Sequence, residues 1–134
     1  MTLGSFTPKS RVNGDKMDLR QQSWYGRPYL IQVQEYTDNF HSKMANNGQG
    51  ASVEAVWVDL MDVATGSVLI NVLFTNGAFV DNLKEHTGTG TVLPVKFGRA
   101  TGGKFGGYAV LEALEGQELA AAQQAYNSWG NVMQ

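Results

Sequence analysis

Five apolar segments, in which side chains alternate with a period of two, constrain the fold of this chain most strongly. Such alternation places one set of side chains in a core and the other set outside it. In one segment Val56, Val58 and Leu60 share a face, so Trp57 and Asp59 point to the opposite face. The five segments are residues 29–36, 52–62, 67–74, 92–97 and 108–114. The pattern predicts a mainly β protein.

Two helical segments complete the predicted order of elements. Asn76 is the predicted N-cap of a short helix, in which Phe79 and Leu83 lie one turn apart on one side. Residues 115–129 form a longer predicted helix that Gly130 ends. A short helix therefore separates the third predicted strand from the fourth, and a second helix follows the fifth.

This order, β-β-β-α-β-β followed by a helix, is that of the five-stranded OB-fold barrel. An OB fold binds oligonucleotides or sugars on the face of its second and third strands. We expect residues 1–28 to be an N-terminal leader, residues 29–114 the barrel, and residues 115–134 a C-terminal helix and tail. Residues 37–51 and 98–107 are the predicted loops that flank the binding face.

Two turn-forming residues refine this prediction. Gly66 closes a tight turn over residues 63–66, where it supplies the positive φ that the turn requires. Pro94 cannot donate a ladder hydrogen bond, so the fourth strand is expected at a sheet edge or a bulge.

The residue types that carry catalysis and metal binding are sparse. The 134 residues, enough for one domain, include no Cys, and neither His41 nor His86 has a second ligand at a metal-binding spacing. Asp59 and Asp62 fall on opposite strand faces and are expected to be solvated rather than an acid–base pair. We therefore expect no catalytic residue, no metal and no small-molecule cofactor, and hence a protein that is not an enzyme.

Residues 98–104 match the spacing of a phosphate-binding loop as far as Lys104. The next residue is Phe105, where such a loop needs Ser or Thr to hold Mg²⁺. A predicted strand then follows, whereas a phosphate-binding loop leads into a helix. The segment is better interpreted as a basic, glycine-rich loop with an aromatic residue.

Charge is unevenly distributed although the formal net charge is only −2. Residues 1–27 carry five Lys or Arg and two Asp, and residues 84–111 carry four Lys or Arg and one Glu. Two local basic surfaces can therefore exist on a chain that is nearly neutral as a whole.

Aromatic and cationic residues in the predicted binding elements are those that single-stranded nucleic acids require, because bases stack on rings and phosphates pair with cations. Trp57 lies on the outward face of the second strand, although it could instead pack under the terminal helix. The candidate nucleic-acid-binding residues are Trp57, Lys96, Arg99, Lys104, Phe105, Tyr108 and, in the first loop, Lys43.

The chain resembles the small OB-fold single-stranded-DNA-binding proteins of tailed bacteriophages, particularly those that infect actinobacteria. The resemblance lies in residues 3–8, 11–13, 26–28, 62–66, 76–83 and 116–121. It implies binding and protection of single-stranded DNA during phage replication or recombination. Cellular single-strand binders usually end in an acidic tail that recruits partners, whereas residues 130–134 carry no acid.

Two other functions fit the same sequence. One is a phage structural or assembly protein that docks through its leader and terminal helix, and the other is an OB-type sugar or peptide binder. A homo-oligomer is compatible with each of these functions. The absence of Cys and of long apolar runs predicts a cytoplasmic protein, in the host cell if phage-encoded, with no signal peptide and no membrane contact.

Overall fold

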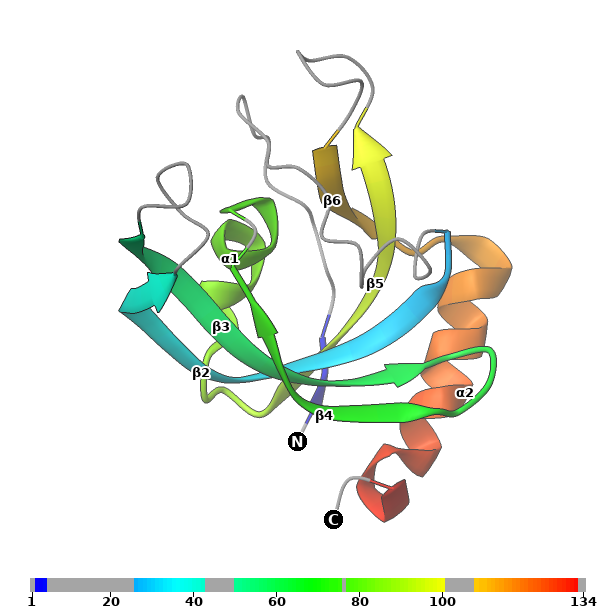
Figure 1. Ribbon diagram of the computed structural model, residues 1–134. Helices are drawn as coiled ribbons and strands as arrows, with labels where there is room; N and C mark the ends of the chain where they lie inside the picture. The colour runs from blue at the N-terminus through cyan, green and yellow to red at the C-terminus, as the bar shows by residue number, and fades with distance from the viewer. Residues whose placement is uncertain (1, 5–25, 43–49, 76, 101–107, 133–134) are drawn as a thin grey trace.

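The computed structural model describes residues 2–4, 26–42, 50–75, 77–100 and 108–132 (Figure 1). The strands are β1 (Thr2–Leu3), β2 (Pro28–Ser42), β3 (Ala51–Asp62), β4 (Val68–Phe74), β5 (Thr91–Ala100) and β6 (Tyr108–Ala113). The helices are α1 (Gly77–Leu83), the 3-10 turn η2 (Lys84–His86) and α2 (Gly116–Val132). The predicted mainly β order, with one helix between two groups of strands and one at the end, is confirmed.

Several predicted boundaries are wrong. Residues 37–42, expected in a loop, continue β2, and Phe40 there pairs with Val53 of β3. Residues 98–100, also expected in a loop, continue β5 and pair with β6. The backbone of these polar or glycine-rich segments gains cross-strand hydrogen bonds that composition does not reveal. Gly130 does not end α2, which continues to Val132.

The sheet has the strand order β1-β5-β2-β3-β4, and β6 also pairs with β5. All pairs are antiparallel except that of β1 with β5. Figure 1 shows the sheet curving around α1, which packs against β3 and β6. In the part of the chain that the structure describes, β4 and β6 do not pair, so the sheet is strongly curved but not closed into a barrel.

Pro94 does not place β5 at an edge, because β5 has neighbours on both sides. It lies between Thr91–Val92, which pair with β1, and Val95–Ala100, which pair with β6. The carbonyl of Val92 accepts from the Gly4 amide at 2.7 Å, so the backbone of Pro94, two residues on, also points to that side. Pro94, which has no N–H to donate, thus lies on this side of β5 between the residues that pair with β1 and those that pair with β6.

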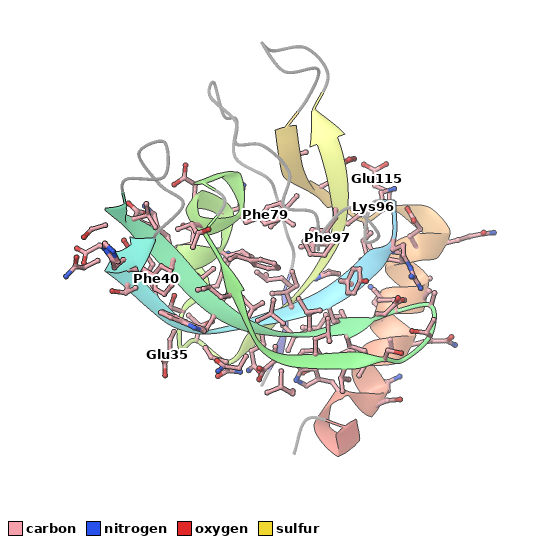
Figure 2. All side chains as sticks on the ribbon, viewed as in Figure 1. Glu35, Phe40, Phe79, Lys96, Phe97 and Glu115 are labelled. Carbon is pink, nitrogen blue, oxygen red and sulfur yellow. The ribbon has the colours of Figure 1, made fainter. Side chains whose placement is uncertain are left out.

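The alternation of β2 supplies apolar side chains to both faces of the sheet. Tyr29, Ile31 and Val33 are buried in an inner core on the concave face, whereas Leu30 is buried on the opposite face. In the inner core the rings of Phe74, Phe79 and Phe97 meet edge to face, with centroids 5.1 to 6.0 Å apart. Figure 2 labels Phe79 and Phe97 in this core. Edge-to-face packing is a favourable geometry for aromatic rings.

A second core lies between the sheet and α2. Leu30, Met61 and Val92 of the sheet pack with Ala122 and Trp129 of α2, and all five are almost fully buried. Trp57 belongs to neither core. Its alternative placement under the terminal helix is therefore not observed.

The turn after β3 is held by the Asp62 side chain, which is buried rather than solvated as expected. Its Oδ1 accepts from the amides of Ala64 at 2.9 Å and Thr65 at 3.4 Å, and its Oδ2 lies 2.6 Å from the Arg27 guanidinium. Gly66 has φ +77°, as the turn requires. Asp62 therefore connects the start of β2 to the β3–β4 turn.

Replacing Asp62 tests this role. Asp62→Ala should lower the free energy of unfolding by about 1–3 kcal/mol, because two amides and a guanidinium lose their acceptor. Asp62→Asn should cost less, because its side-chain oxygen still accepts from both amides. Urea unfolding followed by circular dichroism measures the two losses. Equal losses would contradict the role assigned to Oδ1.

Candidate nucleic-acid interface

The structure locates four of the seven predicted binding residues. Trp57 in β3 and Lys96 in β5 are described with their side chains. Arg99 and Tyr108 are described by their backbone alone, at the end of β5 and the start of β6. Lys43, Lys104 and Phe105 lie outside the described residues.

Trp57 and Lys96 are not brought together. Trp57 pairs with Glu35 of β2, whereas Lys96 pairs with Pro28 at the start of the same strand. Seven residues of extended strand separate these two partners, or roughly 23 Å. Arg99 and Tyr108 lie further along the β5–β6 hairpin, away from Trp57 in the register of the sheet.

Phe40 is the neighbour of Trp57 that the sequence analysis missed. The two rings meet edge to face, with centroids 5.9 Å apart and an interplanar angle of 77°. Ala55 is fully buried on the same face of β3, between Val53, the partner of Phe40, and Trp57. We call Trp57 and Phe40 the aromatic platform; both rings stay partly exposed on the convex face of the sheet.

Aromatic rings in this setting can stack on planar ligands. Trp57 sits near the middle of the sheet, with Glu35 of β2 on one side and Leu73 of β4 on the other. No sequence signal could have placed Phe40 there, because period-two alternation from Tyr36 would put it on the concave face, and the register shift between Thr37 and Phe40 moves it to the face of Trp57. The platform is thus built from a strand extension that the pattern did not predict.

Asp59 holds the backbone beside the platform. Its Oδ1 accepts from the Asn71 amide at 2.9 Å and its Oδ2 accepts from Gln34 Nε2 at 3.0 Å. Both strands that pair with β3 have a register shift near Asp59. In β2 the shift follows Val33, and in β4 it lies between Leu69 and Val72. Asn71 has φ +59°, an uncommon conformation that Asn tolerates. One carboxylate thus stabilises two β-bulges.

The electrostatic environment of the platform is acidic. Glu35 pairs with Trp57 across the strands, and Asp59 follows it by two residues on the same face. The cations described with their side chains are all paired with carboxylates: Arg27 with Asp62 at 2.6 Å, Lys84 with Glu54 at 3.1 Å and Lys96 with Glu118 at 2.9 Å. None of these three cations is therefore without a carboxylate partner.

These pairs also shift the ionisation of their members. The hydrogen bond to Glu118 raises the pKa of Lys96, and the hydrogen bond to Glu54 raises the pKa of Lys84. Desolvation and the nearby Glu54 carboxylate raise the pKa of Tyr36. Each lysine is held as a cation by its partner, so a phosphate would have to compete with that carboxylate.

The described residues contain no cluster of three or more metal-ligating side chains, and no helix among them is long and apolar enough to cross a membrane. Gly98 is the first residue of the segment that matches the spacing of a phosphate-binding loop, and it lies within β5. A Cβ at this position would collide with the Glu112 side chain. Asp59 and Asp62 are both engaged in structural hydrogen bonds, on separate partners.

A double-mutant cycle tests the contact within the platform. Phe40→Ala and Trp57→Ala should couple by about 0.5–1.5 kcal/mol in unfolding free energy, the range for an edge-to-face pair. Phe40→Ala combined with Leu69→Ala is the control, because Leu69 pairs with Leu60, well away from Phe40 in the register. Strict additivity of the Phe40 and Trp57 losses would show that the rings do not interact in solution.

Comparisons with known proteins add no family to this geometry. The chain matches no protein-family model, no curated protein and no solved structure among those searched. The functional interpretation of the interface therefore rests on its residues and their arrangement.

Proposed function

We propose that this protein has an OB-type fold, in which the curved sheet is not closed, and that it binds single-stranded DNA with low sequence specificity and without catalysis. The observation that carries the proposal is Trp57, an aromatic ring held on the outward face of the sheet and outside both hydrophobic cores. Its strand, β3, is second in the proposed five-stranded order, which makes this the face on which OB folds bind their ligands.

Base stacking supplies the affinity in this proposal. Stacking of a base on an aromatic side chain contributes roughly 1–3 kcal/mol and tolerates any base, because every base has a π face. The edge contact from Phe40 restricts the rotation of the Trp57 ring, so less side-chain entropy is lost when a base stacks on it.

Phosphate neutralisation is assigned to basic residues in the two segments that connect β2 to β3 and β5 to β6. Lys43 lies in residues 43–49, which connect β2 to β3, and Lys104 and Phe105 lie in residues 101–107, which connect β5 to β6. Arg99 precedes the second segment. Lys96 contributes only if it leaves Glu118. The resemblance to phage single-strand binders supports a role in protecting DNA during phage replication or recombination.

Tryptophan fluorescence with an oligo-dT of about 16 nucleotides, the upper site size for one OB fold, tests the proposal. We expect quenching on binding, and a log–log salt slope of roughly −0.7 per phosphate neutralised. The variants are compared by the anisotropy of a fluorescently labelled oligo-dT, because they lack the Trp57 ring: Trp57→Ala should weaken binding by roughly 1–3 kcal/mol and Trp57→Phe by less, because Phe keeps a stacking face. Phe105→Ala is expected to act as Trp57→Ala does. Equal affinity for duplex DNA, with no salt dependence, would refute the proposal.

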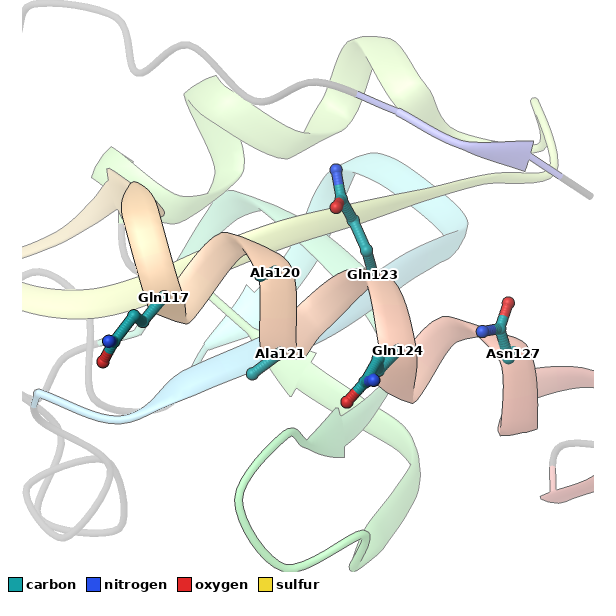
Figure 3. A pocket seen from close by; sticks show the side chains of 6 residues that line it. All are labelled: Gln117, Ala120, Ala121, Gln123, Gln124 and Asn127. Atoms are coloured by element: carbon teal, nitrogen blue, oxygen red, sulfur yellow. The ribbon is translucent and has the colours of Figure 1, made fainter.

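A phage structural or assembly protein is the second candidate, and two surfaces favour it. Leu69 and Ile70 are 42% and 58% exposed on β4, a strand that pairs only with β3 among the described residues. The outer face of α2 carries a set of exposed, uncharged side chains (Figure 3). These are Gln117, Ala120, Ala121, Gln123, Gln124 and Asn127. Exposed apolar residues on an edge strand favour pairing with another chain.

Light scattering of Ile70→Lys separates the two candidates. If β4 mediates assembly, the wild-type protein should form an oligomer and Ile70→Lys should form smaller species, because the new charge opposes strand pairing. Oligo-dT should then bind neither the wild-type protein nor the variant. Glu85→Lys, an exposed change on η2, is the control and should leave the mass unchanged. A wild-type monomer in solution would remove the assembly candidate.

A further inference from the structure

The polar side chains beside Trp57 carry a further inference, which rests on the proposed function. We propose that the Asp59 carboxylate makes the aromatic platform prefer bases with an exocyclic amino group, above all cytosine over uracil or thymine. This preference concerns one stacked base, so it biases binding by composition and does not amount to recognition of a defined sequence.

The register of the sheet places Asp59 where the edge of a stacked base would lie. Trp57 and Asp59 occupy the same face of β3, two residues and therefore roughly 7 Å apart. Gln32 pairs with Asp59 across the strands, and Gln34 donates to it. A base stacked on the indole thus has a row of hydrogen-bonding groups at its edge on one side.

Asp59 keeps acceptor capacity after its bonds within the protein. Each of its oxygens accepts one hydrogen bond, from the Asn71 amide at 2.9 Å and from Gln34 Nε2 at 3.0 Å. An ionised carboxylate offers about four lone-pair sites, so each oxygen can accept another hydrogen bond. Asp59 is also only partly buried, so this capacity is accessible from solvent.

The chemistry of the carboxylate decides which base it favours. A carboxylate only accepts hydrogen bonds, and the N4 amino group of cytosine donates them. Uracil and thymine present the O4 carbonyl at the same position, where acceptor would face acceptor. Adenine and guanine also carry amino groups, but they differ from pyrimidines in stacking area, so cytosine and uracil form the sharper comparison.

The carboxylate is held in place before any ligand arrives. Gln34 Nε2 donates to Asp59 and also to Gln32 Oε1, the latter at 3.1 Å. The Asn71 amide fixes the other oxygen from β4. Because these groups are already ordered, binding of a base to Asp59 loses little further side-chain entropy.

The charge of Asp59 also repels phosphate, but this repulsion does not depend on the base. It lowers the affinity of every oligonucleotide by a similar factor. This shared factor cancels in the ratio of the affinities for two homopolymers of equal length, so the ratio reports on the hydrogen bond alone. The test is therefore the ratio of two measured affinities.

We propose to measure binding of oligo-dC and oligo-dU of equal length by Trp fluorescence, in mildly alkaline buffer that keeps cytosine N3 unprotonated. These probes share their backbone and lack the thymine methyl group. We expect oligo-dC to bind about three- to tenfold more tightly, the range of a modest base preference at one position. Equal affinities for the two oligonucleotides would overturn the inference while leaving the proposed function intact. Failure of both to bind would overturn the proposed function and the inference together.

Two matched substitutions identify the group responsible. Asp59→Asn keeps an oxygen for the Asn71 amide but adds an amino group, so the dC to dU ratio should fall to about one or below. Glu35→Gln removes one negative charge from the same face, opposite Trp57, and should raise the affinity for both oligonucleotides without changing their ratio. A ratio that survives Asp59→Asn, or that is lost in Glu35→Gln, would contradict the assignment to Asp59. The wild-type ratio needs no variant and so tests the inference even if Asp59→Asn does not fold.

Discussion

The pairing of β2 with two different strands is the constraint on which the rest of the structure depends. β2 is 15 residues long, pairs with β3 along its length and with β5 only from Pro28 to Gln32. Its first third therefore lies inside the sheet with apolar side chains on both faces, which produces one core around Phe97 and another beneath α2. Beyond Val33, β2 no longer pairs with β5 and continues with β3, which keeps β4 as its other neighbour as far as Val56. The aromatic platform sits on that extension, outside both cores.

Asp59 connects β2 and β4 across the strand that lies between them, β3. It lies on β3 where the bulges of β2 and β4 face each other, and it bonds to a residue of each. Bulges increase local twist and redirect the strand. A carboxylate that fixes two of them therefore helps set the direction in which the extension, and with it Trp57 and Phe40, leaves the sheet. The same group then lies beside the proposed base-binding position, so structure and recognition share one residue.

The sequence pattern predicted the order of elements and the outward position of Trp57, because period-two alternation reports directly on which face is buried. It did not predict the strand at residues 37–42, where hydrogen bonding to β3 outweighs a polar composition. Nor did it find Phe40, whose importance arises only from its register with Val53. Lys96 was predicted to contact nucleic acid, but its bond to Glu118 depends on where α2 packs, which no local pattern encodes. Asp62 was expected in solvent because its partner Arg27 lies 35 residues earlier in the sequence.

The acidic surroundings of Trp57 bear on how a single strand would be oriented at this face. Two unit charges 4 Å apart in water interact by about 1 kcal/mol, and salt screens exposed charges beyond roughly 8–10 Å. Stacking of one base, at roughly 1–3 kcal/mol, therefore outweighs the repulsion from one neighbouring carboxylate. Repulsion from Glu35 and Asp59 still favours the arrangement in which bases face the platform and phosphates lie away from it. The basic residues assigned to the proposed interface, Arg99, Lys43 and Lys104, are separated in the sequence from these two acids. In the proposed complex, the two acids beside Trp57 would therefore orient the strand, whereas these basic residues would supply its affinity for phosphate.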